Sequence, residues 1–227
     1  MRENITHVIE DYLKAIYELS LAHSRATTNQ IAARMDVAPA SATGMIQRLA
    51  AHEPPLVDYQ KHRGVVLTPA GERAALEIIR HHRLLELFLQ HSLGYTWDEV
   101  HAEADRLEHV ISEQLEERIA KVLGDPVVDP HGEPIPNRDL HLPSREGLRL
   151  CDVPPGQRVK VERMGDTDAE LLRYLASIGL VPGTVVKVLD ISAFDDNLRL
   201  SISGQAEPLV LGLRVTRQIY VELAKDL

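Results

Sequence analysis

The chain has 227 residues, of which 44% are apolar and only 4% aromatic, and its formal net charge at pH 7 is −9. This size and composition are enough for one large or two modest domains with mainly aliphatic cores. The single cysteine, Cys151, excludes an internal disulfide and a cysteine-based zinc or iron–sulfur site. No apolar run near the N-terminus resembles a signal peptide, and none approaches the roughly 20 residues of a membrane span. We therefore expect a cytoplasmic protein that has no contact with membranes.

Residues 1–72 have the pattern of short helices followed by a β-hairpin. Apolar residues recur at helical spacing over residues 5–19, and Thr27-x-x-Gln30 is a capping box that opens a second, short helix. Val37-Ala38-Pro39 breaks that helix, and a third helix follows. Two short β-like runs then flank the polar segment Gln60-Lys61-His62-Arg63-Gly64. Two helices joined by a tight turn and followed by a basic hairpin predict a winged helix-turn-helix that binds DNA.

The third helix is expected to bury an apolar stripe that includes Ile46 and Leu49, which turns its polar side chains outward. Serine and threonine hydroxyls bond phosphates or bases, glutamine reads adenine, and arginine pairs with phosphate or guanine. The basic hairpin tip suits a contact with the sugar–phosphate backbone. The candidate DNA-binding residues are Thr28, Pro39, Ser41, Thr43, Gly44, Gln47, Arg48, Lys61, His62 and Arg63. The alternative is an ordinary helical hairpin beside a solvated basic turn.

Two longer helices are expected next, from about Pro69 to His91 and from about Trp97 to Leu123. The second carries two acids and two histidines at offsets that share one helix face. The first has a histidine and an acid one turn apart, and another acid lies on the polar side of the N-terminal helix. The candidate metal ligands are Asp11, His82, Glu86, His101, Asp105, Glu108 and His109. Their clustering favours a divalent-metal site over the alternative of a solvated polar face. Other histidines, including His81 and His131, are expected to be ordinary surface residues.

The donors in this set are carboxylates and imidazoles, without thiolate or thioether, and such donors suit the harder divalent ions. Mn²⁺ is therefore the first choice and Fe²⁺ the second. Affinity alone does not select Mn²⁺, because this ion lies lowest in the Irving–Williams order, and Zn²⁺ or Co²⁺ would bind at least as tightly in vitro. Selectivity would have to come from coordination number and geometry.

The last part of the chain has a different composition. Residues 125–146 contain five prolines, which exclude a helix and favour an extended, semi-rigid linker. Residues 147–227 alternate apolar runs with Gly, Asp and Asn turns, as expected of a small β-rich module with one helix at about Ala169–Ile178. The sequence thus predicts a mainly α protein with β elements.

Several segments resemble the diphtheria toxin repressor family of metal-dependent regulators along nearly the whole chain. IEDYLKAIYEL is similar to the family's first helix, and VAPASATGMIQRL with YQKHRGVVLTPAG is similar to its manganese transport regulator branch. RHHRLLELFL and EADRLEHVIS resemble the metal and dimer helices. DPHGEPIP resembles the linker of the longer, iron-type members, and IGLVPGTVVKVL resembles their C-terminal SH3-like domain. Glu108-His109 and His-Gly-x-Pro-Ile-Pro are the most specific of these matches.

The resemblance implies three domains and a function. These are a winged helix-turn-helix DNA-binding domain at 1–72, a metal-binding and dimerisation helical domain with a Pro-rich linker at 73–142, and an SH3-like β-barrel at 147–227. It implies a homodimeric, metal-dependent repressor of metal-homeostasis genes that binds double-stranded, palindromic operator DNA and takes no small-molecule substrate. The primary metal site would comprise Asp11, Asp105, Glu108 and His109. The second would comprise His82, Glu86 and His101, with help from Asp168 or Glu170 in the SH3-like domain.

Two departures from the family pattern bear on the metal. Iron-type members carry Met and Cys where this chain has Asp11 and Asp105, and the manganese branch has an acid where this chain has Lys14. Two separate sites therefore fit better than a bridged two-metal site. Without metal, Asp11, Asp105 and Glu108 are expected to repel one another and so to disfavour docking of the first helix. A divalent ion would offset that repulsion and join the helices.

Other interpretations remain open. A metalloenzyme could use a similar cluster to activate water, but the sequence has no separate general base, Gly-rich phosphate loop or nucleophile elbow, so we expect no enzymatic activity. An iron-responsive regulator of the same family is one alternative, and a winged-helix regulator that senses a non-metal effector is another. The SH3-like module could also bind proline-rich peptides, including the chain's own segment Pro134–Pro136.

Overall fold

The computed structural model describes residues 5–22, 24–143, 147–165 and 169–224. The chain forms two compact units. The first consists of residues up to His82 with Asp105–Glu116 and Pro136–Leu142, and the second consists of Arg83–Ala104, Glu117–Ile135 and the chain from Pro143 onward. Among the described residues, no helix combines the length and apolar character that crossing a bilayer requires.

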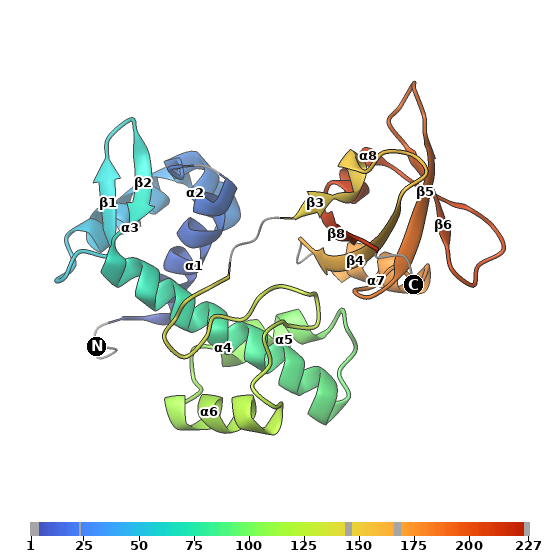
Figure 1. Ribbon diagram of the computed structural model, residues 1–227. Helices are drawn as coiled ribbons and strands as arrows, with labels where there is room; N and C mark the ends of the chain where they lie inside the picture. Colours follow the sequence, from blue (N-terminus) through green and yellow to red (C-terminus); the bar gives the residue numbers. More distant parts are fainter. Residues whose placement is uncertain (1–4, 23, 144–146, 166–168, 225–227) are drawn as a thin grey trace. The chain divides into compact units, whose positions relative to one another are not determined.

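The first unit contains three helices and a hairpin, as the sequence predicts (Figure 1). They are α1 (His7–Ala22), α2 (Thr28–Arg34), α3 (Pro39–Ala50), β1 (Val57–Gln60) and β2 (Gly64–Leu67). The capping box at Thr27 and Gln30 is confirmed in both directions. α1 buries Leu13 and Ile16, and α3 buries Ile46 and Leu49, so one aliphatic core holds the helices and the hairpin together. This core fixes the outward face of α3 and the position of the hairpin tip.

A long helix, α4 (Pro69–Leu93), follows the hairpin. Its middle section is polar yet buried: Arg80, His81, His82, Arg83 and Glu86 are each at most 8% exposed. Buried charged groups in proteins are paired or bind ions, because desolvation without a partner is costly. This section of α4 therefore indicates where a functional site lies.

The prediction of one long helix after Trp97 is wrong. The segment forms two helices, α5 (Val100–Leu107) and α6 (Glu113–Val122), which are separated by a turn. The hydroxyl of Ser112 accepts a hydrogen bond from the Leu115 N–H at 3.2 Å, so Ser112 caps a new helix rather than continuing the old one. Glu108 and His109 consequently lie in the turn after α5, and the four candidate ligands of this segment do not share one helix face.

The C-terminal module is an antiparallel sheet with two helices. Its six strands are β3 (Leu148–Arg149), β4 (Arg158–Met164), β5 (Val185–Ile191), β6 (Leu198–Ile202), β7 (Leu209–Leu211) and β8 (Ile219–Leu223). The strand order is β3-β8-β4-β5-β6-β7. The helices are α7 (Ala169–Ser177) and α8 (Leu213–Thr216), and a 3-10 turn, η2 (Leu150–Asp152), follows β3. Val161, Val188 and Leu200 lie in an aliphatic core against which Trp97 also packs.

The proline-rich linker is less extended than expected. Asp129 Oδ1 accepts hydrogen bonds from the N–H groups of His131 and Glu133, at 2.8 and 2.9 Å, and so closes a tight turn. This turn docks on β4, where the Met164 N–H donates to the His131 carbonyl at 2.9 Å and Arg163 pairs with Glu133 at 3.0 Å. Residues 131–133, which contain no proline, contact the module, whereas the Pro134 carbonyl accepts from Arg83. The alternative that the module binds Pro134–Pro136 stays a prediction.

Candidate metal centre

The first group of possible ligands joins α1 to the turn after α5. Asp11, Glu108 and His109 each offer a donor atom, and these atoms lie within 4.8 Å of one another. The His109 Nε2 lies 3.0 Å from Asp11 Oδ1 and 3.6 Å from Glu108 Oε1. Glu108 is only 1% exposed, whereas Asp11 reaches solvent. An imidazole and two carboxylates that converge in this way form a donor set suited to a divalent ion.

His109 carries a proton in this arrangement. Hydrogen bonds to Asp11 and then Glu10 raise its pKa to about 9, despite partial burial. Nδ1 lies 2.7 Å from the Glu10 carboxylate, so Glu10 orients the ring and Nε2 faces the group. Glu10 is a residue that sequence reasoning missed. It lies next to Asp11 in the sequence, and a ligating histidine usually donates its other N–H to such a carboxylate.

A second group, His82, Asp105 and Glu108, shares Glu108 with the first. The four residues expected to form the primary site are therefore divided, because Asp105 joins His82 rather than Asp11. The ammonium of Lys14 contacts all three members of this group. The expected repulsion among the carboxylates in the absence of metal is consequently offset, since Lys14 and protonated His109 both face them.

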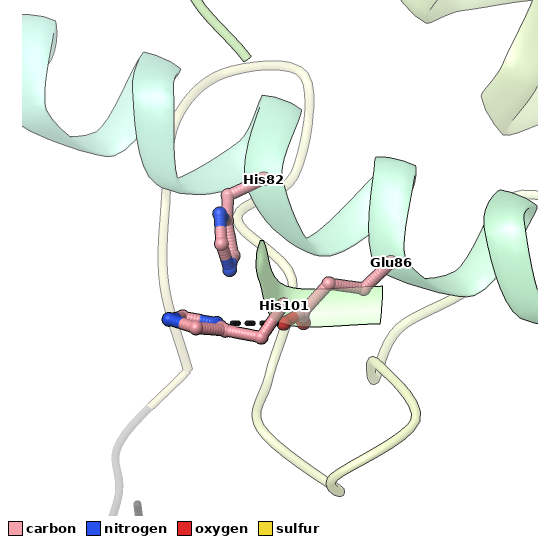
Figure 2. Close-up of side chains that lie close together, drawn as sticks. All are labelled: His82, Glu86 and His101. Carbon is pink, nitrogen blue, oxygen red and sulfur yellow. Dashed lines mark hydrogen bonds and ion pairs between the residues drawn. The ribbon is translucent and has the colours of Figure 1, made fainter. Parts of the chain in front are cut away.

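The third group is His82, Glu86 and His101, as the sequence predicts. His101 Nδ1 lies 3.0 Å from Glu86 Oε1, and His82 lies one turn earlier on the same helix as Glu86 (Figure 2). Glu86 is 1% exposed. Of the two expected helpers in the module, Asp168 lies outside the described residues. Glu170 lies in the first turn of α7 and is not a member of any ligand group among the residues that the structure describes.

Two further residues, Asp129 and His131, lie beside Glu86. His131 Nε2 is 3.7 Å from Glu86 Oε1, and both Asp129 and His131 are 6% exposed. Burial, and then the negative charge of Glu86, raise the pKa of Asp129. The expectation that His131 is a surface residue is wrong, because the tight turn folds it inward. The signal that could have found these residues is an acid and a histidine around one proline in an otherwise linker-like run.

His81 is also misassigned by the sequence pattern, since it is fully buried behind the turn. Its Nδ1 lies 3.0 Å from the Glu108 carbonyl oxygen, and its Nε2 lies 3.3 Å from the Glu116 carboxylate. Burial raises the pKa of Glu116, but His81 and Arg80 outweigh that effect, so the net shift is downward. His81 thus connects the backbone of Glu108 to α6 and holds the turn that carries Glu108 and His109.

The candidate DNA-binding residues lie on α2, α3 and the hairpin tip. Pro39, Ser41, Gly44, Gln47 and Arg48 are exposed on α3, and the hairpin tip at Lys61, His62 and Arg63 is exposed as well. Thr43 is half-buried and its hydroxyl donates to the Pro39 carbonyl at 2.8 Å. Thr28, the first residue of α2, is half-buried. Arg25 pairs with Asp58 at 2.9 Å at the base of the hairpin.

Three family models match the chain in succession. The N-terminal DNA binding domain of iron dependent repressors matches residues 4–65, their metal binding and dimerisation domain matches 68–137, and the FeoA domain matches 148–223. The chain is similar to the iron-dependent repressor IdeR of Mycobacterium leprae, with 32% identity over 198 residues that cover 82% of this chain and 85% of that protein.

Solved structures give the same result. A manganese-dependent transcriptional repressor in complex with manganese is similar with a TM-score of 0.84 and 38% identity, covering 95% of this chain and 100% of that one. ScaR with bound Zn²⁺ is similar with a TM-score of 0.81 and 35% identity, covering 95% and 99%. Together with the family models, these likenesses confirm the expected fold class of a DNA-binding domain, a helical dimerisation domain and an SH3-like FeoA domain.

Proposed function

Because the chain belongs to the diphtheria toxin repressor family and is a metal-dependent DNA-binding repressor, we propose that Mn²⁺ is the ion that activates it. The family consists of transcriptional repressors rather than enzymes. We further propose that the protein acts as a homodimer on palindromic operators of metal-homeostasis genes. The outward residues of α3 would read the major groove, and the hairpin tip would contact the backbone.

Two observations support Mn²⁺. The buried donors are carboxylates and imidazoles, which suit harder ions than thiolates do. A solved relative with 38% identity is described as a manganese-dependent repressor with manganese bound. Relatives of the iron-dependent type are 32–34% identical, so an iron-responsive regulator is the second candidate. In this chain Asp11 and Asp105 provide oxygen donors where the iron-type pattern has sulfur.

The observation that carries the proposal is the convergence of Asp11, Glu108 and His109. We assign these three residues as the ligands of the regulatory site. A bound divalent ion supplies two positive charges to this group. Asp11 belongs to α1, which packs in the same core as the DNA-reading helix α3, whereas Glu108 and His109 belong to the turn after α5. Ligation by all three would therefore fix α1, and with it α3, against the helical domain.

We assign His82, Glu86 and His101 to a second site, with Asp129 and His131 as additional donors. All of these residues except His101 are at most 6% exposed, and the buried carboxylate of Glu86 disfavours ionisation of Asp129. A buried pair of acids beside histidines fits a divalent ion, which would allow both acids to ionise. Because the Asp129 turn docks on β4, this second site would stabilise the attachment of the SH3-like module.

The test is metal-dependent DNA binding. A palindromic duplex is first selected by the protein from random-sequence DNA in the presence of Mn²⁺. Fluorescence anisotropy then measures its affinity with chelator, Mn²⁺, anaerobic Fe²⁺ and Zn²⁺ at matched free-ion levels. We expect Mn²⁺ to raise the affinity by about 5–150-fold, the range of ordinary allosteric coupling. Stronger activation by Fe²⁺ than by Mn²⁺ would favour the iron-responsive alternative.

Matched substitutions connect the response to the site. Asp11→Asn and Glu108→Gln should abolish the response to Mn²⁺ while leaving a folded protein. Asp196→Asn and Glu207→Gln remove the same charges from exposed positions of the C-terminal module and should leave the response unchanged. A full metal response in both Asp11→Asn and Glu108→Gln would show that the regulatory site lies elsewhere.

A further inference from the structure

The two ligand groups that share Glu108 differ in how many of their donor atoms contact the Lys14 ammonium. In the group His82, Asp105 and Glu108, the donor atoms lie within 4.8 Å of one another. The Lys14 Nζ lies 3.1 Å from His82 Nδ1, 3.1 Å from Asp105 Oδ1, and 3.0 and 2.8 Å from the two Glu108 oxygens. Every donor in this group therefore already contacts one and the same ammonium. In the other group, Lys14 reaches only the shared Glu108.

The ammonium of Lys14 lies in a largely buried position. The Lys14 side chain is 12% exposed, and its partner Glu108 is 1% exposed. A lysine ammonium has three donors and no acceptor, and is a compact point charge. The Lys14 ammonium can therefore donate to the carboxylates of Asp105 and Glu108 at the same time.

We propose that Lys14 is a built-in cation that fills the second of two adjacent cation positions, so that this centre takes one divalent ion per protomer and stays assembled without it. The inference rests on the proposed function, because it assumes that Asp11, Glu108 and His109 bind the regulatory ion. Beyond the proposed function, the inference specifies how many ions bind at this centre and names Lys14 as the residue that limits their number.

Charge matching supports the inference. Asp11, Asp105 and Glu108 with Lys14 have a formal charge of −2, and Glu10 beside His109 adds a further −1, so one divalent ion offsets most of the charge. A second divalent ion would have to displace an ammonium from a carboxylate that is almost fully buried. Because Lys14 already compensates that buried charge, a second ion would gain only the difference between its own interaction and that of the ammonium. In the metal-free protein, Lys14 also ties α1 to Asp105 and Glu108, so the ion completes a docked contact rather than creating it.

The first experiment counts ions. All variants carry Glu86→Gln, which removes the buried carboxylate of the second site. Equilibrium dialysis against Mn²⁺ should give one ion per protomer with Lys14 present and two ions with Lys14→Glu, which supplies a carboxylate in place of the ammonium. Electron paramagnetic resonance should show isolated Mn²⁺ in the first case and an exchange-coupled pair in the second.

The second experiment measures the metal-free state. In chelator, Lys14→Met should lower Tm by about 5–10 °C, because buried Glu108 loses its cation. Lys121→Met removes a 61% exposed lysine and serves as the matched control, with an unchanged Tm. Lys14→Arg keeps the charge and should retain most of the stability, which separates the role of the charge from that of packing.

The outcomes separate this inference from the proposed function. Two coupled ions in the protein with Lys14, one ion in Lys14→Glu, or an unchanged Tm in Lys14→Met would each overturn the role of Lys14. The first two of these results would leave the proposed metal regulation intact. A centre that holds no Mn²⁺ with Lys14 present would overturn the proposed function as well.

Discussion

His109 is a cation in the metal-free centre, because hydrogen bonds to Asp11 and Glu10 raise its pKa to about 9. A histidine that ligates a metal must be deprotonated at the ligating nitrogen, so metal binding has to release a proton from Nε2. We expect the apparent affinity for Mn²⁺ to rise about tenfold per pH unit from neutral pH to about pH 9. Titration calorimetry in buffers of different ionisation enthalpy counts the released protons, and a count of zero at pH 7 would contradict this prediction.

The same shift affects the stability of the chelated protein. The folded state holds the His109 proton more tightly than the unfolded chain, whose pKa is near 6.5. This stabilisation is fully present below pH 6.5 and is lost as the pH rises through about 9. Asp129 also has a raised pKa and acts in the same direction. Glu10→Gln removes one cause of the His109 shift and leaves Asp129 unchanged. The difference in Tm between the unsubstituted protein and Glu10→Gln, both in chelator, should therefore shrink as the pH rises towards 9.

The sequence predicted residues better than it predicted their partners. Asp11, Glu108 and His109 converge, and so do His82, Glu86 and His101. Lys14 was noted only as a departure from a family pattern, and its contacts with His82, Asp105 and Glu108 depend on packing between segments far apart in the chain. His81 and His131 were missed for the same reason, because burial of a histidine is decided by what folds over it.

At the scale of elements, the Asp129–Glu133 turn depends on a glycine. Gly132 has a φ of +85°, and a Cβ there would lie 2.0 Å from the Glu162 carbonyl oxygen of β4. Gly132→Ala should therefore undock the turn, and hydrogen exchange at the Met164 N–H should accelerate. Gly124→Ala is the matched control: its φ is +77° and a Cβ there meets no atom within 4 Å, so it adds only backbone strain of about 1–2 kcal/mol. Equal exchange rates in the two variants would contradict this account.

The helical segment after Trp97 shows where sequence reasoning at this scale ends. Helical spacing continues through His101, Asp105 and Glu108, and it predicts one helix. The hydroxyl cap at Ser112 and the packing of His81 against the Glu108 carbonyl favour a turn instead. Periodicity detects the preferred faces of a helix, but it does not detect a local cap that competes with the helix. The hairpin, the capping box and the strand pattern were predicted well because short-range chemistry determines them.

At the scale of the whole molecule, an acidic protein must bind a polyanion. The net charge is −9, whereas Arg48 on α3 and Lys61 and Arg63 at the hairpin tip are exposed basic residues. Removing the cationic partner of one phosphate should reduce the slope of log K against log salt by about 0.9. Arg48→Ala and Arg63→Ala should each lower the slope by about twice that in a homodimer, and Lys187→Ala, in the module, should not. Unchanged slopes in both arginine variants would exclude these phosphate contacts.

The chain has a single tryptophan, and its indole lies beside His131 in the proposed second site. Trp97 Nε1 donates to the Pro130 carbonyl at 3.0 Å, its ring centroid is 5.1 Å from that of His131, and it packs against the core of the module. All indole emission therefore arises beside a proposed ligand and beside the turn that docks on β4. Tryptophan fluorescence of the unlabelled protein can therefore be used as a probe. The emission maximum and the fluorescence lifetime should change when a metal ion binds at the proposed second site and when the Asp129–Glu133 turn undocks from β4.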